Sequence, residues 1–119
     1  MNDKIRNFRD LKIWQNGIEI VKDIYSYLRS FPEEEKCALT SQIRRSSVSI
    51  PSNIAEGFNR YHNKEYRQFL YVSLGSLAEL ETQIERARAV EYIKQKNYEQ
   101  LLDKITLESK MIRSLIKKL

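Results

Sequence analysis

SQIRRSSVSIPSNIAEG, residues 41–57, is the stretch of sequence that decides the fold. Its apolar side chains, with Leu39 just before them, have the spacing of one helical face: Leu39, Ile43, Ile50 and Ile54. The opposite face carries serines and only two charged residues, Arg45 and Glu56. A helix face in water is normally rich in charged side chains. We therefore expect a helix whose outer face is covered by another helix or by a ligand.

Apolar spacing of three and four residues predicts a helix on each side of this stretch and a fourth after them. The predicted helices span about residues 10–30, 33–57, 63–92 and 97–118. We expect Asp10, Asn63 and Asn97 to cap the first, third and fourth helices, and Gly57 to end the second in a left-handed conformation. The inner stripe expected for the first helix is Leu11, Trp14, Ile18, Val21, Tyr25 and Leu28.

Short connections between long helices make sequence neighbours antiparallel. The fold class predicted for residues 1–119 is therefore all-α, a single antiparallel up-down-up-down four-helix bundle. Pro51 interrupts the hydrogen bond to the carbonyl of Ser47. Because the apolar stripe keeps its phase across this proline, we expect helix two to be kinked at Pro51 and not broken.

The segment FLYVSLGSLAEL, residues 69–80, is apolar or small nearly all round. A bundle buries only one stripe of each helix, so the remaining apolar side chains need a second explanation. We favour contact between subunits over additional packing within one subunit. The candidate oligomer-interface residues are Arg45, Ser49, Ser52, Glu56, Gly75, Ser76 and Glu79.

The formal charge of +5 is unevenly distributed. Residues 36–67 and the tail from Lys104 are each strongly basic, whereas residues 19–35 and 68–103 are acidic. Clustered positive charge favours a polyanionic partner. The candidate nucleic-acid-binding residues are Arg44, Arg45, Arg60, Tyr61, Lys64 and Arg67. Among them, Tyr61 is the aromatic ring best placed to stack on an unpaired base.

Each of these assignments has a structural alternative. Arg45 fits a phosphate contact, but an ion pair with Glu79 or Glu56 of another subunit is the interpretation we favour. Arg44 lies nearer the edge of the core, where an arginine can simply extend its charged end to water. The basic residues of the last helix also complement the negative end of its dipole.

The sequence does not predict an enzyme, and it indicates no cofactor and no metal. It contains no nucleophile–base motif and no phosphate-binding glycine loop. One cysteine, Cys37, and one histidine, His62, exclude an internal disulfide and a zinc site of Cys and His ligands within one chain. Glu79 fits a structural ion pair better than an acid or base. The N-terminal residues MNDKIRNFRD lack an apolar core, and no apolar run is long enough for a bilayer, so we expect a cytoplasmic protein without a membrane partner.

Three blocks of sequence resemble the 23S rRNA-intervening-sequence protein family: FRDLKIWQ (8–15), QIRRSSVSIPSNIAEG (42–57) and FLYVSLGSLAELETQI (69–84). The resemblance covers nearly the whole chain. It implies a bacterial up-down four-helix subunit that assembles into a homo-oligomer, a ring of five copies, whose biochemical role in the family is largely unassigned.

Two functions remain open at this point. The first is a homopentameric protein that binds RNA or DNA through basic patches with little sequence specificity. The second is a scaffold or adaptor that binds a partner protein, with the positive charge serving only solubility.

Overall fold

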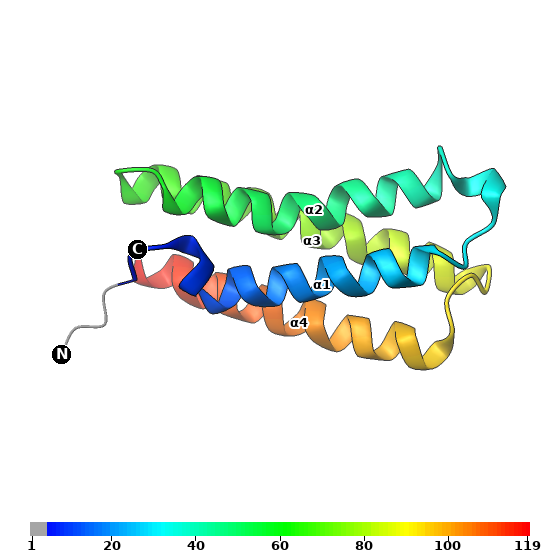
Figure 1. Ribbon diagram of the computed structural model, residues 1–119. Helices are drawn as coiled ribbons and strands as arrows, with labels where there is room; N and C mark the ends of the chain where they lie inside the picture. The colour runs from blue at the N-terminus through cyan, green and yellow to red at the C-terminus, as the bar shows by residue number, and fades with distance from the viewer. Residues whose placement is uncertain (1–4) are drawn as a thin grey trace.

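Four long amphipathic helices account for most of residues 5–119, the part of the chain that the computed structural model describes (Figure 1). Within these residues there is no strand, and the predicted all-α four-helix fold is confirmed. Residues 1–4, which belong to the predicted domain and to the N-terminal segment MNDKIRNFRD, lie outside the described part. The helices are α1 (Lys12–Leu28), α2 (Leu39–Phe58), α3 (Asn63–Ala89) and α4 (Gln95–Lys118), with short 3-10 helices η1 (Phe8–Asp10) and η2 (Glu33–Glu35).

Neighbouring helices run in opposite directions. Across the seam between α2 and α3, residue numbers rise on one helix as they fall on the other, in the pairs Ser46–Gln83, Ser49–Ser76 and Ile50–Ser73. The seam between α1 and α4 shows the same order, in the pairs Asn16–Glu108 and Asp23–Lys104. In Figure 1 the α2–α3 turn and the C-terminus therefore lie at one end of the bundle, and the other two connections lie at the opposite end.

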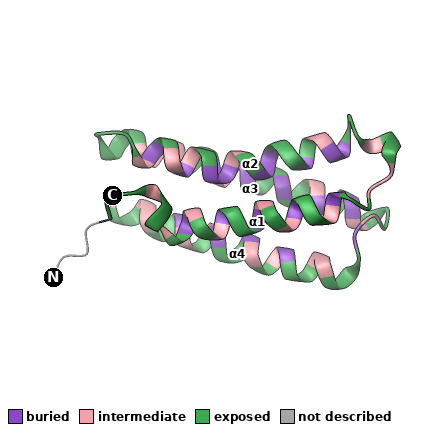
Figure 2. Ribbon diagram, viewed as in Figure 1, coloured by how far each residue is buried: buried purple, intermediate pink, exposed green. Residues whose placement is uncertain are grey.

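Branched aliphatic side chains fill the centre of the bundle, and the buried positions follow the inward faces of the helices (Figure 2). The inner stripe predicted for the second helix is confirmed in α2 by Ile43, Ile50 and Ile54, which are fully buried. In α3, Leu70 and Leu80 are fully buried as well. In α4 the same holds for Leu101, Ile105 and Ile112.

The inner face predicted for the first helix is right at Leu28 and wrong at Ile18 and Tyr25. Leu11 and Trp14 of the predicted stripe are half-buried and pack against the core. The buried residues of α1 are Ile13, Gly17, Ile20, Ile24 and Leu28, whereas Ile18 and Tyr25 are exposed. Both sets have helical spacing, so periodicity alone does not separate them. Gly17 decides between them, because its missing side chain lets the Pro51 ring of α2 approach to within 3.5 Å of the position that a Cβ atom would occupy. This close approach turns the Gly17 side of α1 inward.

The second helix begins later than predicted. Residues 33–35 form η2, and α2 starts only at Leu39, because Ala38 adopts φ −118° and ψ −107°, outside the helical region. The chain reverses direction between α1 and α2, and the residues before Leu39 supply that reversal. Further along, α2 continues through Pro51 to Phe58. The bend at Pro51 stays a prediction.

The three predicted N-caps are also wrong. Asp10 lies in η1, and Leu11 precedes α1 without a side-chain cap. Asn63 is the first residue of α3, after His62, and Asn97 lies inside α4, which starts at Gln95. In each case the helix begins within two residues of the predicted cap, and the cap position itself carries no side-chain hydrogen bond.

The helix ends differ from the prediction at two further positions. Gly57 is not a left-handed terminator, since it lies inside α2, and its missing side chain makes room for Tyr66 and Phe69 of α3. The residue with a positive φ is Glu91 (φ 63°), just after α3. The amide of Glu91 bonds to Arg88 and the amide of Tyr92 to Ala87, the two hydrogen bonds of a Schellman motif. α3 therefore ends at Ala89, earlier than residue 92.

No helix in residues 5–119 has the length and apolar character that crossing a lipid bilayer would require.

Candidate nucleic-acid interface

The six candidate nucleic-acid-binding residues fall into two groups. Arg44 and Arg45 lie in the first half of α2, whereas Arg60, Tyr61, Lys64 and Arg67 lie at and after the α2–α3 turn. A helix rises 1.5 Å per residue, so about 20 Å separates Arg45 from Arg60. The two groups therefore lie on separate parts of the surface.

The two arginines of α2 have different surroundings. The guanidinium carbon of Arg44 lies 5.6 Å from the centre of the Tyr25 ring, a cation–π contact that covers an exposed ring of α1. Arg45 is exposed and lines a shallow hollow with Ser49, Glu79 and other residues of α2 and α3. Within the described residues, Arg45 makes no ion pair with Glu79 or Glu56.

At the α2–α3 turn, Arg60 is held by its own chain. Its Nη2 atom donates to Glu56 Oε2 at 2.6 Å, and its guanidinium carbon lies 4.9 Å from the centre of the Phe69 ring. By contrast, Tyr61 is 99% exposed and Lys64 is exposed as well. Tyr61 and Lys64 are therefore the two residues of this group that are most open to a ligand.

Arg67 connects two parts of the chain that are far apart in sequence. Its Nη1 atom donates to the carbonyl oxygen of Leu119 at 2.6 Å. This contact places the end of α4 beside the start of α3. As a result, the basic tail of α4 lies at the same end of the bundle as Arg60 and Lys64.

We call this region the basic end and define it as residues 5–12, 56–67 and 110–119. It contains ten basic and three acidic side chains, a net charge of +7, whereas the whole chain carries +5. The rest of the chain is therefore slightly acidic. The basic residues are Arg6, Arg9, Lys12, Arg60, Lys64, Arg67, Lys110, Arg113, Lys117 and Lys118. A concentration of one sign of charge on one surface attracts polyanions over a Debye length.

The candidate interface residues also divide into two sets. Ser76 is buried, and its hydroxyl lies 2.8 Å from that of Ser49, so these two small residues join α2 to α3 within one subunit. Asn53 donates to the carbonyl oxygen of Ser49, one turn earlier in α2, at 2.9 Å. In contrast, Ser52 is exposed, and a Cβ atom at Gly75 would meet nothing within 4 Å.

A polar residue that sequence reasoning missed lies in the core. Glu108 of α4 is fully buried, and burial raises the pKa of its carboxyl to about 7, although a hydrogen bond from Asn16 partly lowers it. The signal was present in the sequence, because Glu108 stands between Ile105 and Ile112 at the position that the inner stripe of α4 should fill with an apolar residue.

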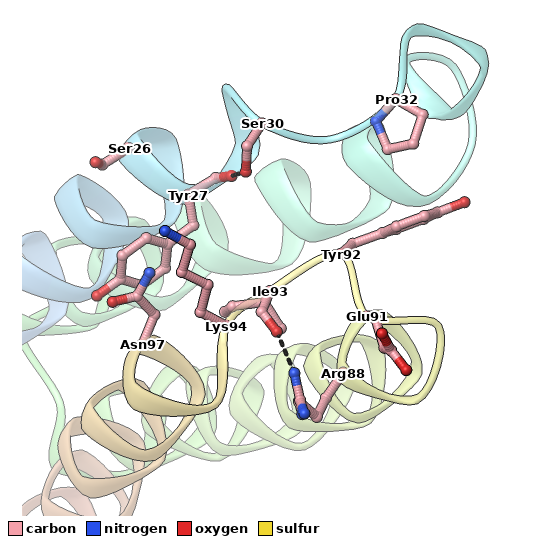
Figure 3. Close-up of a pocket in the computed structure, with 10 residues that line it drawn as sticks. All are labelled: Ser26, Tyr27, Ser30, Pro32, Arg88, Glu91, Tyr92, Ile93, Lys94 and Asn97. Atoms are coloured by element: carbon pink, nitrogen blue, oxygen red, sulfur yellow. Dashed lines mark hydrogen bonds between the residues drawn. The ribbon is translucent and has the colours of Figure 1, made fainter.

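A hollow lies at the end of the bundle opposite the basic end, and Figure 3 shows the residues that line it. This open cleft of about 810 Å³ lies between the end of α1 and the α3–α4 connection. Its lining includes Arg88, whose Nη1 atom donates to the carbonyl oxygen of Ile93 at 2.7 Å and so holds the connection in place. Among residues 5–119, no group of three or more His, Cys, Asp or Glu side chains is arranged to hold a metal ion.

The comparisons with known proteins agree with this architecture. A comparison with curated proteins finds no match. A crystal structure of a protein of unknown function from Bacteroides thetaiotaomicron, assigned to the S23 ribosomal protein family, is similar to the chain with a TM-score of 0.82. The two are 25% identical, over 88% of this chain and 98% of that one. The model of the 23S rRNA-intervening sequence protein family matches residues 9–114. The chain therefore belongs to the 23S rRNA-intervening sequence protein family.

Proposed function

We propose that the protein is a non-enzymatic homo-oligomer that binds RNA or DNA through its basic end, with little sequence specificity. The observation that carries the proposal is the gathering of ten basic side chains against three acidic ones at one end of the bundle. Contacts between such side chains and phosphates release counterions, which supplies affinity without reading sequence. Tyr61, almost fully exposed beside Lys64, adds a ring on which an unpaired base can stack.

Self-association is the second part of the proposal. Apolar side chains are exposed on α1 and α2 (Ile18, Tyr25 and Val48) and on α3 (Tyr71 and Val72), which supports a contact between subunits. A ring of five, as the family resemblance implies, would present about five basic ends to one polyanion and add weak contacts by avidity. The same interface would include exposed Arg45, Ser52, Gly75 and Glu79. A nucleic-acid partner and an unpaired cysteine favour a cytoplasmic location.

Fluorescence anisotropy with labelled single-stranded RNA and duplex DNA tests binding. The test variant combines Lys64→Gln, Lys117→Gln and Lys118→Gln, three exposed residues of the basic end. The matched control combines Lys22→Gln, Lys94→Gln and Lys96→Gln, which removes the same charge from exposed positions elsewhere.

Wild-type affinity should fall steeply as salt rises from about 50 mM to about 200 mM. In the test variant, the slope of log affinity against log salt for RNA should shrink by about 2, since each phosphate contact contributes about 0.7. The control should keep the wild-type slope. Equal losses in both variants, or binding that is indifferent to salt, would refute the proposal.

The alternative function, a scaffold that binds a partner protein, has its own supporting observation. An apolar groove of about 300 Å³ lies between η1, α1 and α2 and is lined by Phe8, Trp14, Ile18, Val21, Val48, Pro51, Ser52 and Ala55. Light scattering separates the two functions. A stable oligomer supports the first, whereas a monomer that fails to bind nucleic acid at low salt leaves this groove free for a foreign protein.

A further inference from the structure

Glu108 is an ionisable residue buried among the aliphatic side chains of the core. It is fully buried, in the same stripe of α4 as Ile105 and Ile112. Burying an isolated carboxylate costs far more free energy than burying a neutral group of the same shape. The protonation state of this one side chain therefore matters for how α4 packs.

The two carboxyl oxygens of Glu108 have different surroundings. Asn16 of α1 donates to Oε1 at 3.0 Å, and the same amide nitrogen lies 3.2 Å from the carbonyl oxygen of Lys104. Oε2 is buried and has no hydrogen-bond partner among the described residues. It lies 3.2 Å from the position that a Cβ atom would occupy at Gly17, and the Pro51 ring lies 3.5 Å from the same position. Oε2 is thus enclosed by a glycine of α1 and a proline of α2.

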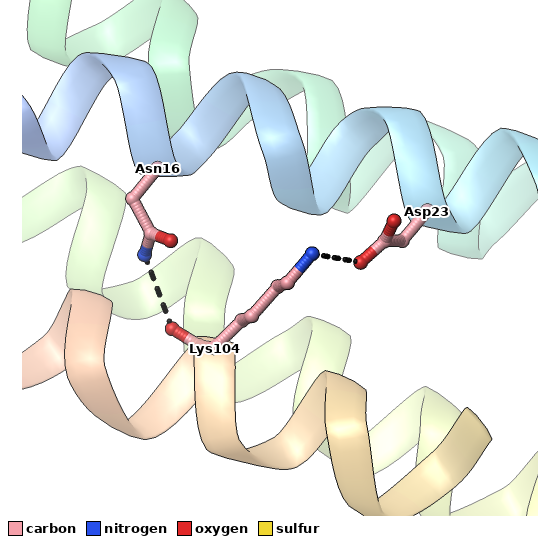
Figure 4. Close-up of polar contacts among 3 residues, drawn as sticks. All are labelled: Asn16, Asp23 and Lys104. Atoms are coloured by element: carbon pink, nitrogen blue, oxygen red, sulfur yellow. Dashed lines mark hydrogen bonds and ion pairs between the residues drawn. The ribbon is translucent and has the colours of Figure 1, made fainter. Parts of the chain in front are cut away.

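No cation in the described residues compensates a charge on Glu108. On α4, Lys104 is one turn away, but its Nζ atom lies 2.6 Å from Oδ2 of Asp23 on α1 (Figure 4). α1 presents Asn16 and Gly17 to the carboxyl, and α2 presents Pro51.

Where α4 faces α3, the nearby charged residues are Glu81 of α3 and Lys110 and Arg113 of α4. All three are exposed and line an outer groove that does not include Glu108. The pKa of Glu108 is accordingly raised by burial, and the Asn16 hydrogen bond opposes this rise.

We propose that proton binding by Glu108 controls how firmly α4 docks against α1 and α2. The protonated carboxyl is neutral and fits the site between Asn16, Gly17 and Pro51. The ionised carboxyl favours a state in which α4 has moved away and water reaches Glu108. Because α4 carries Lys110, Arg113, Lys117 and Lys118, this equilibrium also controls how much of the basic end is assembled. The inference does not depend on nucleic-acid binding.

Amide hydrogen exchange of the free protein tests the proposal. Three proteins are compared: a His62→Gln background, the same with Glu108→Gln, and the same with Asp103→Asn as a control at an exposed carboxylate of α4. The His62→Gln change removes the histidine, the residue type that ordinarily titrates near neutral pH. Exchange rates are corrected for the intrinsic effect of pH.

In the background protein and the Asp103→Asn control, opening of the α4 amides around Leu101–Ile112 should increase about thirtyfold between about pH 5.5 and about pH 8, and level off above about pH 7. Amides of the α2 and α3 cores should respond less. Glu108→Gln should remove the response, because glutamine has the shape of the neutral acid and does not titrate.

Three results would overturn the proposal: a flat response in the background protein, the same response with Glu108→Gln, or equal responses in all four helices. If the glutamine variant does not fold, infrared spectroscopy of the background protein still decides. A protonated carboxyl band should be present near pH 6 and lost near pH 8, and its absence near pH 6 would contradict the inference.

Discussion

The same substitution, glycine to alanine, has opposite predicted effects at two helical positions. At Gly75 in α3, an added Cβ atom would meet nothing within 4 Å. At Gly57 in α2, the Cβ atom would lie 2.8 Å from Cβ of Phe69 and 3.2 Å from the carbonyl oxygen of Tyr66. The chemical change is identical, so the contrast isolates packing between α2 and α3.

The magnitudes follow from propensity and overpacking. Inside a helix, alanine is favoured over glycine by about 1 kcal/mol, so Gly75→Ala should stabilise the subunit by about that amount. This corresponds to a rise in Tm of about 4 °C for a chain of this size. The gain in helix propensity is smaller for Gly57→Ala, because Gly57 lies near the end of α2. Overpacking against the backbone of Tyr66 costs about 1–3 kcal/mol. We expect a net loss of about 1–2 kcal/mol.

Urea unfolding followed by circular dichroism, at several protein concentrations, measures both effects. Gly75→Ala should raise the unfolding midpoint without changing the m-value. Because Gly75 is a candidate subunit contact, the added methyl group should also weaken the oligomer, which should then dissociate at a higher protein concentration than the wild type does. The packing argument is refuted if Gly57→Ala is as stable as the wild type, or if Gly75→Ala gains nothing at any concentration.

Three further predictions concern single contacts. Glu91→Gly should raise the free energy of unfolding by about 1 kcal/mol in a urea titration, because glycine adopts the positive φ of Glu91 without strain; a loss would contradict this account. Between about pH 4.5 and about pH 7 the unfolded chain releases the Glu108 proton while the folded chain keeps it, so stability falls as the pH rises. The free energy of unfolding should fall by about 3 kcal/mol in total, and the fall should be complete above about pH 7. Urea titrations at each pH measure it, and Glu108→Gln should not show it. A double-mutant cycle of Asp23→Asn and Lys104→Gln should give a coupling energy of about 0.5–1 kcal/mol that weakens with salt, since this half-buried pair is partly screened by water; zero coupling would show that the ion pair contributes nothing.

Much of the fold follows from the sequence, because α2, α3 and α4 each have one continuous apolar stripe. The buried face of α1 does not follow from the sequence, because two overlapping sets of apolar residues fit a helix equally well. What decides between them is the contact of Gly17 with Pro51 and Glu108, and neither partner is near Gly17 in sequence. The helix starts differ from the prediction for a related reason, because tertiary packing and chain reversal outweigh local capping preferences.

The candidate site was predictable in part. The basic stretches 36–67 and 104–119 are visible in the charge pattern. That residues 60–67 meet the tail of α4 at one end depends on the register of α3 against α4, which the Arg67–Leu119 contact records. Tyr61, the ring that the sequence favours for stacking, is almost fully exposed. The serines of α2 and α3 were ambiguous, because the same small side chains serve close packing within a subunit, as Ser49 and Ser76 do, or between subunits.

Photochemical cross-linking to labelled RNA, followed by mass spectrometry of the linked peptides, tests the central claim most directly. The account predicts cross-links in the peptides that contain Tyr61 and Lys64, and in the basic tail from Lys110 to Lys118. Cross-links confined to Arg44 and Arg45, or to the end of the bundle that carries the α1–α2 and α3–α4 connections, would contradict it.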